Sequence, residues 1–297
     1  AGKKVTSVSD PNTKLLGGKE GIGASPHRLL GSTIGDQLKL ITSGQAKVIG
    51  ISLKDRAAIL PAGHRPNGAY WYDDTTGKIV SSTYYFNDLP AWVKQFNQES
   101  CADKYFGRKW EKLLPEAAYT RSLPDDSPFE KWAYGKTFPY VITGGETKPV
   151  GKFFKQFEAT PFANEMLVNL AKAAMENEQL GQDDIPDVLT VSFSANDILG
   201  HYLGPNSPEV QDMTIRTDRL LADFLAYVDK KVGLQNTIIA FTSDHGVAPI
   251  PEHAQSLGLG GRMDIEEITK IINNELNKRF GTQKWVASVN YGNVYLD

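Results

Sequence analysis

Cysteine is nearly absent from this sequence of 297 residues, in which Cys101 is the only one. A single thiol excludes an intrachain disulfide framework and a zinc site built from cysteines. No apolar run approaches the roughly 18 residues that a membrane-spanning helix needs, so we expect no membrane span. Runs of lysine and arginine are also missing, and the net charge is -3. Without a basic stripe, nucleic acid is not expected as an obligate partner.

The remaining composition is that of an ordinary globular protein, with 40% hydrophobic and 23% charged residues. The length could hold one large α/β domain or two small ones, and we expect residues 1–297 to form a single domain. An insertion or cap is predicted at about residues 64–158. The reason is that residues 99–158 are aromatic, charged and weakly periodic. Residues 1–31, which are rich in Gly, Lys and Ser, are predicted to be loop.

Strand and helix patterns alternate along the chain. Three short runs of apolar and β-branched residues predict buried strands: Ala46–Leu53, Asp187–Ser194 and Asn236–Ser243. Helices are predicted to begin at Thr160-Pro161 and Ser207-Pro208, where an N-cap residue precedes proline. This alternation predicts the α/β class, with a central, mainly parallel sheet sandwiched by helices. The three strands should be neighbours or near-neighbours in that sheet.

Two ligand-type residues follow the second predicted strand. Asp197 and His201 are four positions apart, so a helical turn would place both side chains on one face. Carboxylate oxygen and imidazole nitrogen together suit Zn²⁺ best among common ions. The alternative is an aspartate that caps a helix and a histidine that lies on the surface.

The third predicted strand ends in Asp244-His245-Gly246, where a tight turn would present two more ligand-type side chains. Taken alone, the motif could be an Asx-turn with a satisfied histidine. However, ligands gather at the carboxyl ends of parallel strands, and this end would bring the second Asp/His pair beside the first. Two neighbouring metal sites are what a bimetallic phosphatase needs.

A cationic pair follows the first predicted strand, at Lys54 and Arg56. The guanidinium group could contact phosphate oxygens as a fork, and the ammonium group could act as a point charge. The alternative is a solvated charge cluster in which Asp55 pairs locally.

Four stretches closely resemble the PafA-like bacterial alkaline phosphatases, from the type I phosphodiesterase/nucleotide pyrophosphatase branch of the alkaline phosphatase superfamily. These stretches are Ile51–Tyr85, Leu89–Asn97, Phe193–Pro205 and Thr242–Gly246. The first and third are specific to the phosphatase branch, whereas Asp-His-Gly alone also occurs in sulfatases and phosphomutases.

The resemblance implies two Zn²⁺ ions flanking a threonine nucleophile. Asp197 and His201 would bind one ion, and Asp244 and His245 would bind the other. Lys54 and Arg56 would contact the phosphoryl group and favour a dianionic monoester. The resemblance places the threonine, an Asp ligand and a phosphate-binding Asn upstream of residue 1, and a final His ligand downstream of residue 297. Because Asn293–Leu296 also has a strand pattern where the sequence stops, we expect a chain that is incomplete at both ends and inactive by itself.

The expected function of the full-length protein is therefore zinc-dependent hydrolysis of small phosphate monoesters, by a periplasmic or secreted monomer. Three alternatives stay open: a phosphodiesterase or nucleotide pyrophosphatase, a phosphonate hydrolase or phosphomutase, and an inactive metal-binding or interaction module. Ser32 and Thr33 fit helix capping better than the position of the nucleophile. We also expect His64 to be structural and His27 to lie in a surface loop.

Overall fold

The computed structural model describes residues 5–99, 101–290 and 292–297. The chain divides into two compact units, one formed by Thr6–Val247 and one formed mainly by Ala248–Asp297. None of the helices in these described ranges is both long and apolar enough to cross a membrane.

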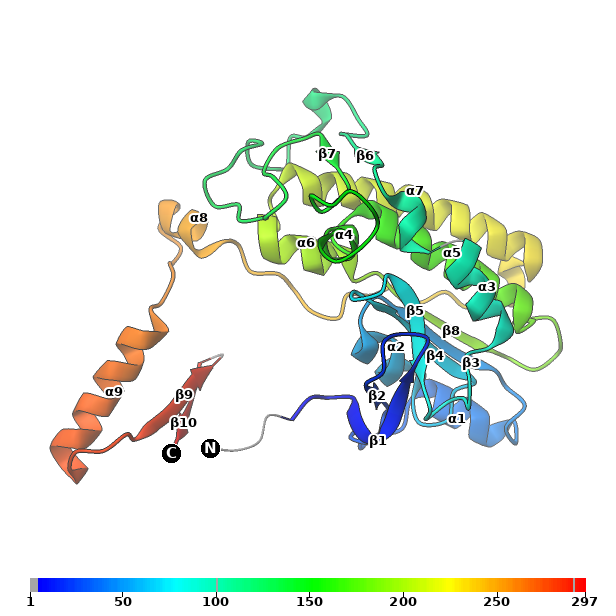
Figure 1. Cartoon of the computed structure of the whole chain (residues 1–297), viewed down its shortest axis with the longest axis horizontal. Helices are drawn as coiled ribbons and strands as arrows, with labels where there is room; N and C mark the ends of the chain where they lie inside the picture. Colours follow the sequence, from blue (N-terminus) through cyan, green and yellow to red (C-terminus); the bar gives the residue numbers. More distant parts are fainter. Residues whose placement is uncertain (1–4, 100, 291) are drawn as a thin grey trace. The chain divides into compact units, whose positions relative to one another are not determined.

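The larger unit is built on a six-stranded mixed sheet with the strand order β2-β1-β5-β4-β3-β8 (Figure 1). Its strands are β1 (Ser9–Leu16), β2 (Ile22–Ala24), β3 (Val48–Ser52), β4 (Gly68–Asp73), β5 (Lys78–Ser82) and β8 (Val188–Ser192). Strand β3 runs parallel to both β4 and β8, while the pairs β4/β5, β5/β1 and β1/β2 are antiparallel. Two of the three predicted core strands are thus direct neighbours in register.

Seven α-helices belong to the described part of this unit: α1 (Ile34–Ile41), α2 (Asp55–Ala62), α3 (Ala91–Glu99), α4 (Lys152–Phe157), α5 (Pro161–Asn177), α6 (Ala195–Leu203) and α7 (Pro208–Lys231). The short strands β6 (Lys109–Trp110) and β7 (Tyr140–Val141) pair antiparallel in the region between α3 and α4. In the smaller unit, α8 (Pro251–Ser256) and α9 (Ile265–Phe280) precede the hairpin of β9 (Val286–Asn290) and β10 (Asn293–Leu296).

Successive side chains along each strand point to opposite faces of the sheet. They therefore contribute to two hydrophobic cores, one on each face. Ile49 and Ile51 of β3 face a core that includes Leu167 of α5. Trp71 of β4 faces the other way and packs with Ile59 of α2. Helices therefore cover both faces, which confirms the predicted α/β class.

The prediction of loop for residues 1–31 is wrong at β1 and β2. Strand β1 contains Asp10, Pro11 and Asn12, and its pairing with β2 shifts register between Asp10 and Lys14. These polar residues and the irregular pairing break the alternation of apolar and polar residues that identifies a strand from sequence.

The prediction of a third core strand at Asn236–Ser243 is also wrong. A 3-10 helix covers Leu234–Asn236, and the chain that follows has no strand assignment. Ile238 is 98% exposed and Phe241 is 82% exposed. A run of β-branched residues reports a preference for burial in a sheet, yet in the described chain the outer edge of β8 has no hydrogen-bonded neighbour.

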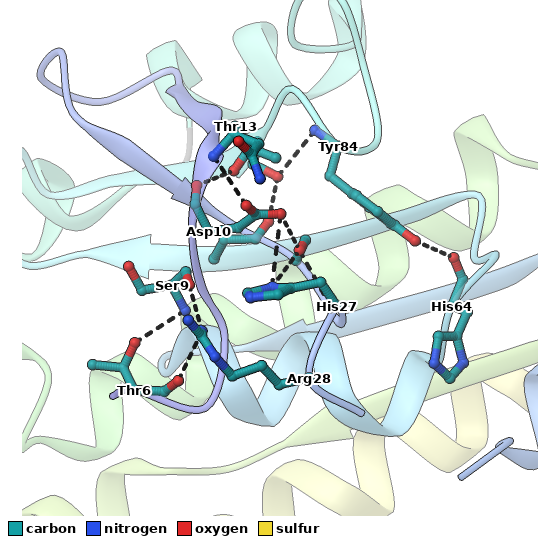
Figure 2. Close-up of polar contacts among 12 residues, drawn as sticks. Thr6, Ser9, Asp10, Thr13, His27, Arg28, His64 and Tyr84 are labelled. Atoms are coloured by element: carbon teal, nitrogen blue, oxygen red, sulfur yellow. Dashed lines mark hydrogen bonds and ion pairs between the residues drawn. The ribbon is translucent and has the colours of Figure 1, made fainter. Parts of the chain in front are cut away.

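Polar contacts tie the segment that follows β2 to strand β1 (Figure 2). The Ser25 hydroxyl donates to Asp10 Oδ2 at 2.6 Å, and His27 Nδ1 lies 3.0 Å from the same hydroxyl oxygen. His27 lies in a loop, as expected. Nearby, the Tyr84 hydroxyl donates to the His64 carbonyl at 2.8 Å. These contacts are local and structural.

A second polar cluster fixes α1 beside the end of α2. Thr33 forms a capping box with Asp36 at the start of α1, as its sequence position predicts. The other carboxylate oxygen of Asp36 accepts from the His64 backbone N–H at 2.7 Å. The His64 ring lies 2.8 Å from Asp36 through Nδ1 and 2.9 Å from the Leu29 carbonyl through Nε2. His64 therefore has the structural surroundings expected of it.

Candidate active site

The cationic pair lies where β3 turns into α2. Lys54 is the N-cap of α2 and has an extended backbone, so its side chain leaves the sheet at the carboxyl end of β3. The turn is tight because β3 and α2 approach closely at Gly50. A Cβ added there would lie 2.0 Å from the Ala58 carbonyl oxygen. Glycine at position 50 thus allows the packing that holds Lys54 and Arg56 above the strand end.

The first Asp/His pair lies where the neighbouring strand turns into α6. Because β8 is parallel to β3, with Ser192 opposite Ser52, both strands end at the same edge. The hydroxyls of Ser52 and Ser194 lie 3.0 Å apart and tie the two strand ends together. Asp197 is in the first turn of α6, so it projects over this shared edge.

Asp197 is the centre of the site. The Lys54 ammonium donates to its Oδ2 atom, and His201 Nε2 lies 3.4 Å from its Oδ1 atom. The helical spacing predicted for Asp197 and His201 is confirmed by their positions in α6. The second pair joins them although its segment is not a strand: His245 Nε2 lies 3.5 Å from Asp197 Oδ1 and 3.5 Å from Asp244 Oδ2.

The charges around Asp197 set its protonation. Burial alone would raise the pKa of Asp197, but the hydrogen bond and charge of Lys54 outweigh it, with a smaller contribution from the two histidines. The pKa of Asp197 is therefore lowered, and the carboxylate is ionised at neutral pH. The Asp197 and Lys54 side chains are 20% and 22% exposed, whereas His201 is 76% and Asp244 is 85% exposed. The histidines and Asp244 thus face solvent around a half-buried ion pair.

The donor types at this site fit Zn²⁺, because each pair offers a carboxylate oxygen and an imidazole nitrogen. The number of donors is low, since a catalytic zinc ion usually has three protein ligands. Across the described ranges, no three His, Cys, Asp or Glu side chains are arranged to hold a metal ion. The donor atoms of these residues therefore fit zinc, but two donors are fewer than a catalytic zinc site usually has.

Arg56 lines a cleft of about 280 Å³, which Lys54 of the Lys54–Asp197 ion pair also lines. Its lining includes the cations Lys54 and Arg56 and the acidic residues Asp73, Asp74 and Glu158. Burial and the charge of Asp74 raise the pKa of Glu158 to about 7. These three acidic residues were missed by the sequence interpretation, although Asp73 and Asp74 lie at the end of β4, and the end of a strand is the position that identified Lys54.

The sequence matches the family described as Type I phosphodiesterase / nucleotide pyrophosphatase over residues 32–274. Over 301 residues it is 40% identical to Alkaline phosphatase PafA of Elizabethkingia meningoseptica, covering 100% of this chain and 55% of that protein. A Myroides odoratus protein named Calcium-transporting ATPase is also 40% identical, over 303 residues, with the same coverage. Alkaline phosphatase PhoV of Synechococcus elongatus is 39% identical over 285 residues, covering 94% of this chain and 51% of PhoV. The chain thus spans about half the length of these relatives.

Solved structures agree with the sequence matches. The crystal structure of wild-type PafA superposes with a TM-score of 0.87 at 38% identity, covering 99% of this chain and 56% of PafA. A PafA variant with four substitutions, of a threonine, an asparagine, a lysine and an arginine, superposes with a TM-score of 0.90 at the same identity and coverage. With a family match over most of its length and this shared fold, the chain belongs to the type I phosphodiesterase/nucleotide pyrophosphatase family.

Proposed function

We propose that the full-length protein hydrolyses phosphate monoesters as a two-zinc phosphatase. The observation that carries this proposal is the convergence of Lys54, His201 and His245 on Asp197 at the shared end of β3 and β8. This arrangement places an ammonium group that can bind phosphate beside four side chains of the kinds that bind zinc. The similarity to PafA and PhoV, which are named alkaline phosphatases, supports the same reaction.

In this proposal, Asp197 and His201 hold one Zn²⁺ ion and Asp244 and His245 hold the other. Bound zinc would lower the pKa of an oxygen nucleophile and neutralise charge on the leaving oxygen. Arg56 offers a guanidinium fork to two phosphoryl oxygens, and Lys54 offers a point charge to a third. Their role is to stabilise the negative charge that the phosphoryl oxygens carry in the transition state.

The substitutions in the PafA variant support the roles of the cationic pair. Its substituted lysine and arginine are two positions apart, as Lys54 and Arg56 are. The variant also has a substituted threonine, which fits a threonine nucleophile. A periplasmic or secreted monomer is part of the same proposal.

A phosphodiesterase is the second candidate, because the family description names that activity. Two cations beside one phosphoryl site favour the monoester, which carries one more negative charge than a diester. The cationic pair therefore matches a dianionic phosphoryl group better.

Hydrolysis of an aryl phosphate and a bis-aryl phosphate by the protein from its complete reading frame, with Zn²⁺, tests this choice. We expect the monoester to be preferred, and Arg56→Ala to lower kcat/KM for the monoester by about 100- to 1,000-fold. The loss for the diester should be smaller. A preference for the diester, or equal losses for both substrates, would contradict the proposal.

A further inference from the structure

The cleft beside Arg56 holds opposite charges in one small volume. We propose that it selects phosphate monoesters whose alcohol part carries a positively charged amine. The phosphate would lie at Lys54 and Arg56, and the amine would lie at Asp74 and Glu158. This inference rests on the proposed phosphatase function and names the class of substrate that the site accepts.

The phosphate end of the cleft is formed by the start of α2. Lys54 and Arg56 line it together with the first helical residue, Asp55. The Asp55 carboxylate accepts from the Arg56 backbone N–H at 2.6 Å, so its charge is directed to the helix start. The Arg56 guanidinium has no hydrogen bond or ion pair with any other described residue. It is therefore free to take a phosphate.

The amine end of the cleft is formed by Asp74 and Glu158. The neighbouring Asp73 is occupied, because it accepts from the Thr75 hydroxyl at 2.7 Å and from the Thr76 hydroxyl at 2.6 Å. In contrast, the nearest cation to the Asp74 carboxylate is Lys155, at 3.9 Å and largely exposed. Glu158 is half-buried, and its carboxylate has no hydrogen bond or ion pair with another described residue.

The electrostatics around Asp74 and Glu158 indicate negative charge that nearby lysines compensate only in part. Burial is the largest reason why the pKa of Glu158 is raised, and the charge of Asp74 raises it further. Lys155 and Lys54 act in the opposite direction but do not compensate. An ammonium group placed between Asp74 and Glu158 would relieve this repulsion and favour both ionised carboxylates.

The cations of the cleft compensate its acidic residues only in part, because the charge of Lys54 lowers the pKa of Glu158 without offsetting burial. Lys54 donates to Asp197, which lies outside the cleft lining, and not to Glu158. The Arg56 guanidinium and the Glu158 carboxyl group are thus left for the two charges of a zwitterionic ligand. A volume of about 280 Å³ accommodates a small amino-alkyl phosphate. A neutral alkyl phosphate would satisfy one end only.

Binding of ethyl phosphate and of 2-aminoethyl phosphate to the 297-residue chain, measured by calorimetry, tests the inference without requiring turnover. The two ligands differ chiefly by the amine. We expect 2-aminoethyl phosphate to bind about five-fold more tightly, the size of one partly exposed ion pair. Asp74→Asn and Glu158→Gln should each reduce this ratio, and together they should bring it to about one. Asp184→Asn, which removes an exposed carboxylate that is not part of the cleft lining, should leave the ratio unchanged.

Each outcome of this comparison separates the two proposals. If both ligands bind with equal affinity, the amine subsite is wrong and the phosphate site stands. If neither ligand binds, the phosphate site itself is wrong. If the five-fold ratio persists in the double variant, the amine is recognised by other residues. Asp74 is 40% exposed in a turn, so Asp74→Asn keeps the test decisive even if Glu158→Gln fails to fold.

Discussion

The Nε2 atom of His245 lies 3.5 Å from the Oδ1 atom of Asp197, although the segment that carries His245 is not a strand. The Asp197 carboxylate therefore joins the two predicted ligand pairs. Its other oxygen accepts from Lys54. The properties of the site depend most on this carboxylate.

Asp197→Asn should destabilise the metal-free chain by about 1–2 kcal/mol, because it removes a charged hydrogen-bond acceptor from Lys54. The effect should depend on pH. The pKa of Asp197 is lowered in the folded state, so its stabilisation is present above the unfolded pKa and is lost as the pH falls through the folded pKa. Urea unfolding of both proteins from neutral to acidic pH checks this. Equal midpoints at neutral pH would contradict it, and Asp184→Asn serves as the control for an exposed carboxylate.

The 297-residue chain by itself should bind Zn²⁺ weakly and hydrolyse an aryl phosphate negligibly. Each proposed site has two protein ligands among the described residues, and three are usual for catalytic zinc. Calorimetric titration with Zn²⁺ should show no stoichiometric binding at micromolar protein, and His201→Ala should weaken the binding further. Stoichiometric zinc at both pairs, or turnover close to that of a full-length relative, would mean that other residues complete the sites.

A pair of buried acids on α7 and its neighbouring loop should make stability fall as the pH rises. Burial, and then the charge of Glu209, raises the pKa of Glu130 to about 8. Burial also raises the pKa of Glu209 to about 7, although the Tyr140 hydroxyl donates to its Oε1 atom at 2.6 Å. Neither carboxylate oxygen of Glu130 has a hydrogen-bond partner. Both acids thus bind protons more tightly when folded than their ordinary pKa of 4.5 allows.

Proton linkage determines whether the stability of the protein rises or falls with pH. The folded state holds more protons, so stability is highest below the unfolded pKa and is lost as the pH rises through about 7 to 8. Glu130→Gln should reduce the dependence of stability on pH. It should also stabilise the protein at about pH 9, where the wild-type protein must either ionise the buried Glu130 carboxyl group or unfold. Thermal unfolding of both proteins at several pH values decides the matter. A slope that Glu130→Gln leaves unchanged would refute the assignment.

Phe241→Ser should change stability by less than about 0.5 kcal/mol, because the side chain is 82% exposed. Ile51→Ala should cost about 2–5 kcal/mol, since Ile51 of β3 is fully buried. Comparison of the two urea midpoints therefore tests whether residues 236–243 lie outside the sheet. A large loss for Phe241→Ser would show that this segment is packed as a strand.

The sequence predicted those features that local pattern determines. The strands around Ile51 and Val191, the helix that places Asp197 and His201 on one face, and the capping by Thr33 are all readable from short stretches. Periodicity and capping depend on residues that are close in sequence, so they can be recognised without knowledge of the rest of the fold.

Other features depend on partners that are remote in sequence. The residues 236–243 have the composition of a strand, but pairing requires a neighbour that composition does not reveal. The same limit explains why Glu158 was missed. Its place in the cleft depends on the approach of the region after α4 to the turn after β4, which no local pattern records. The meeting of Lys54 with Asp197 was only implicit in the prediction that β3 and β8 are parallel neighbours.

The open edge of β8 has a consequence for handling the protein. Strand β8 has no charged residue, and residues 236–243 carry neither charge nor proline while exposing Ile238, Ile239 and Phe241. Unprotected edges and short, uncharged, β-prone segments are where intermolecular strand pairing and aggregation begin. The concentration at which this chain stays dispersed should therefore be limited by the edge of β8 and by the exposed segment 236–243. Ile239→Lys, which places a charge in that segment, should raise this concentration while leaving the two cores untouched.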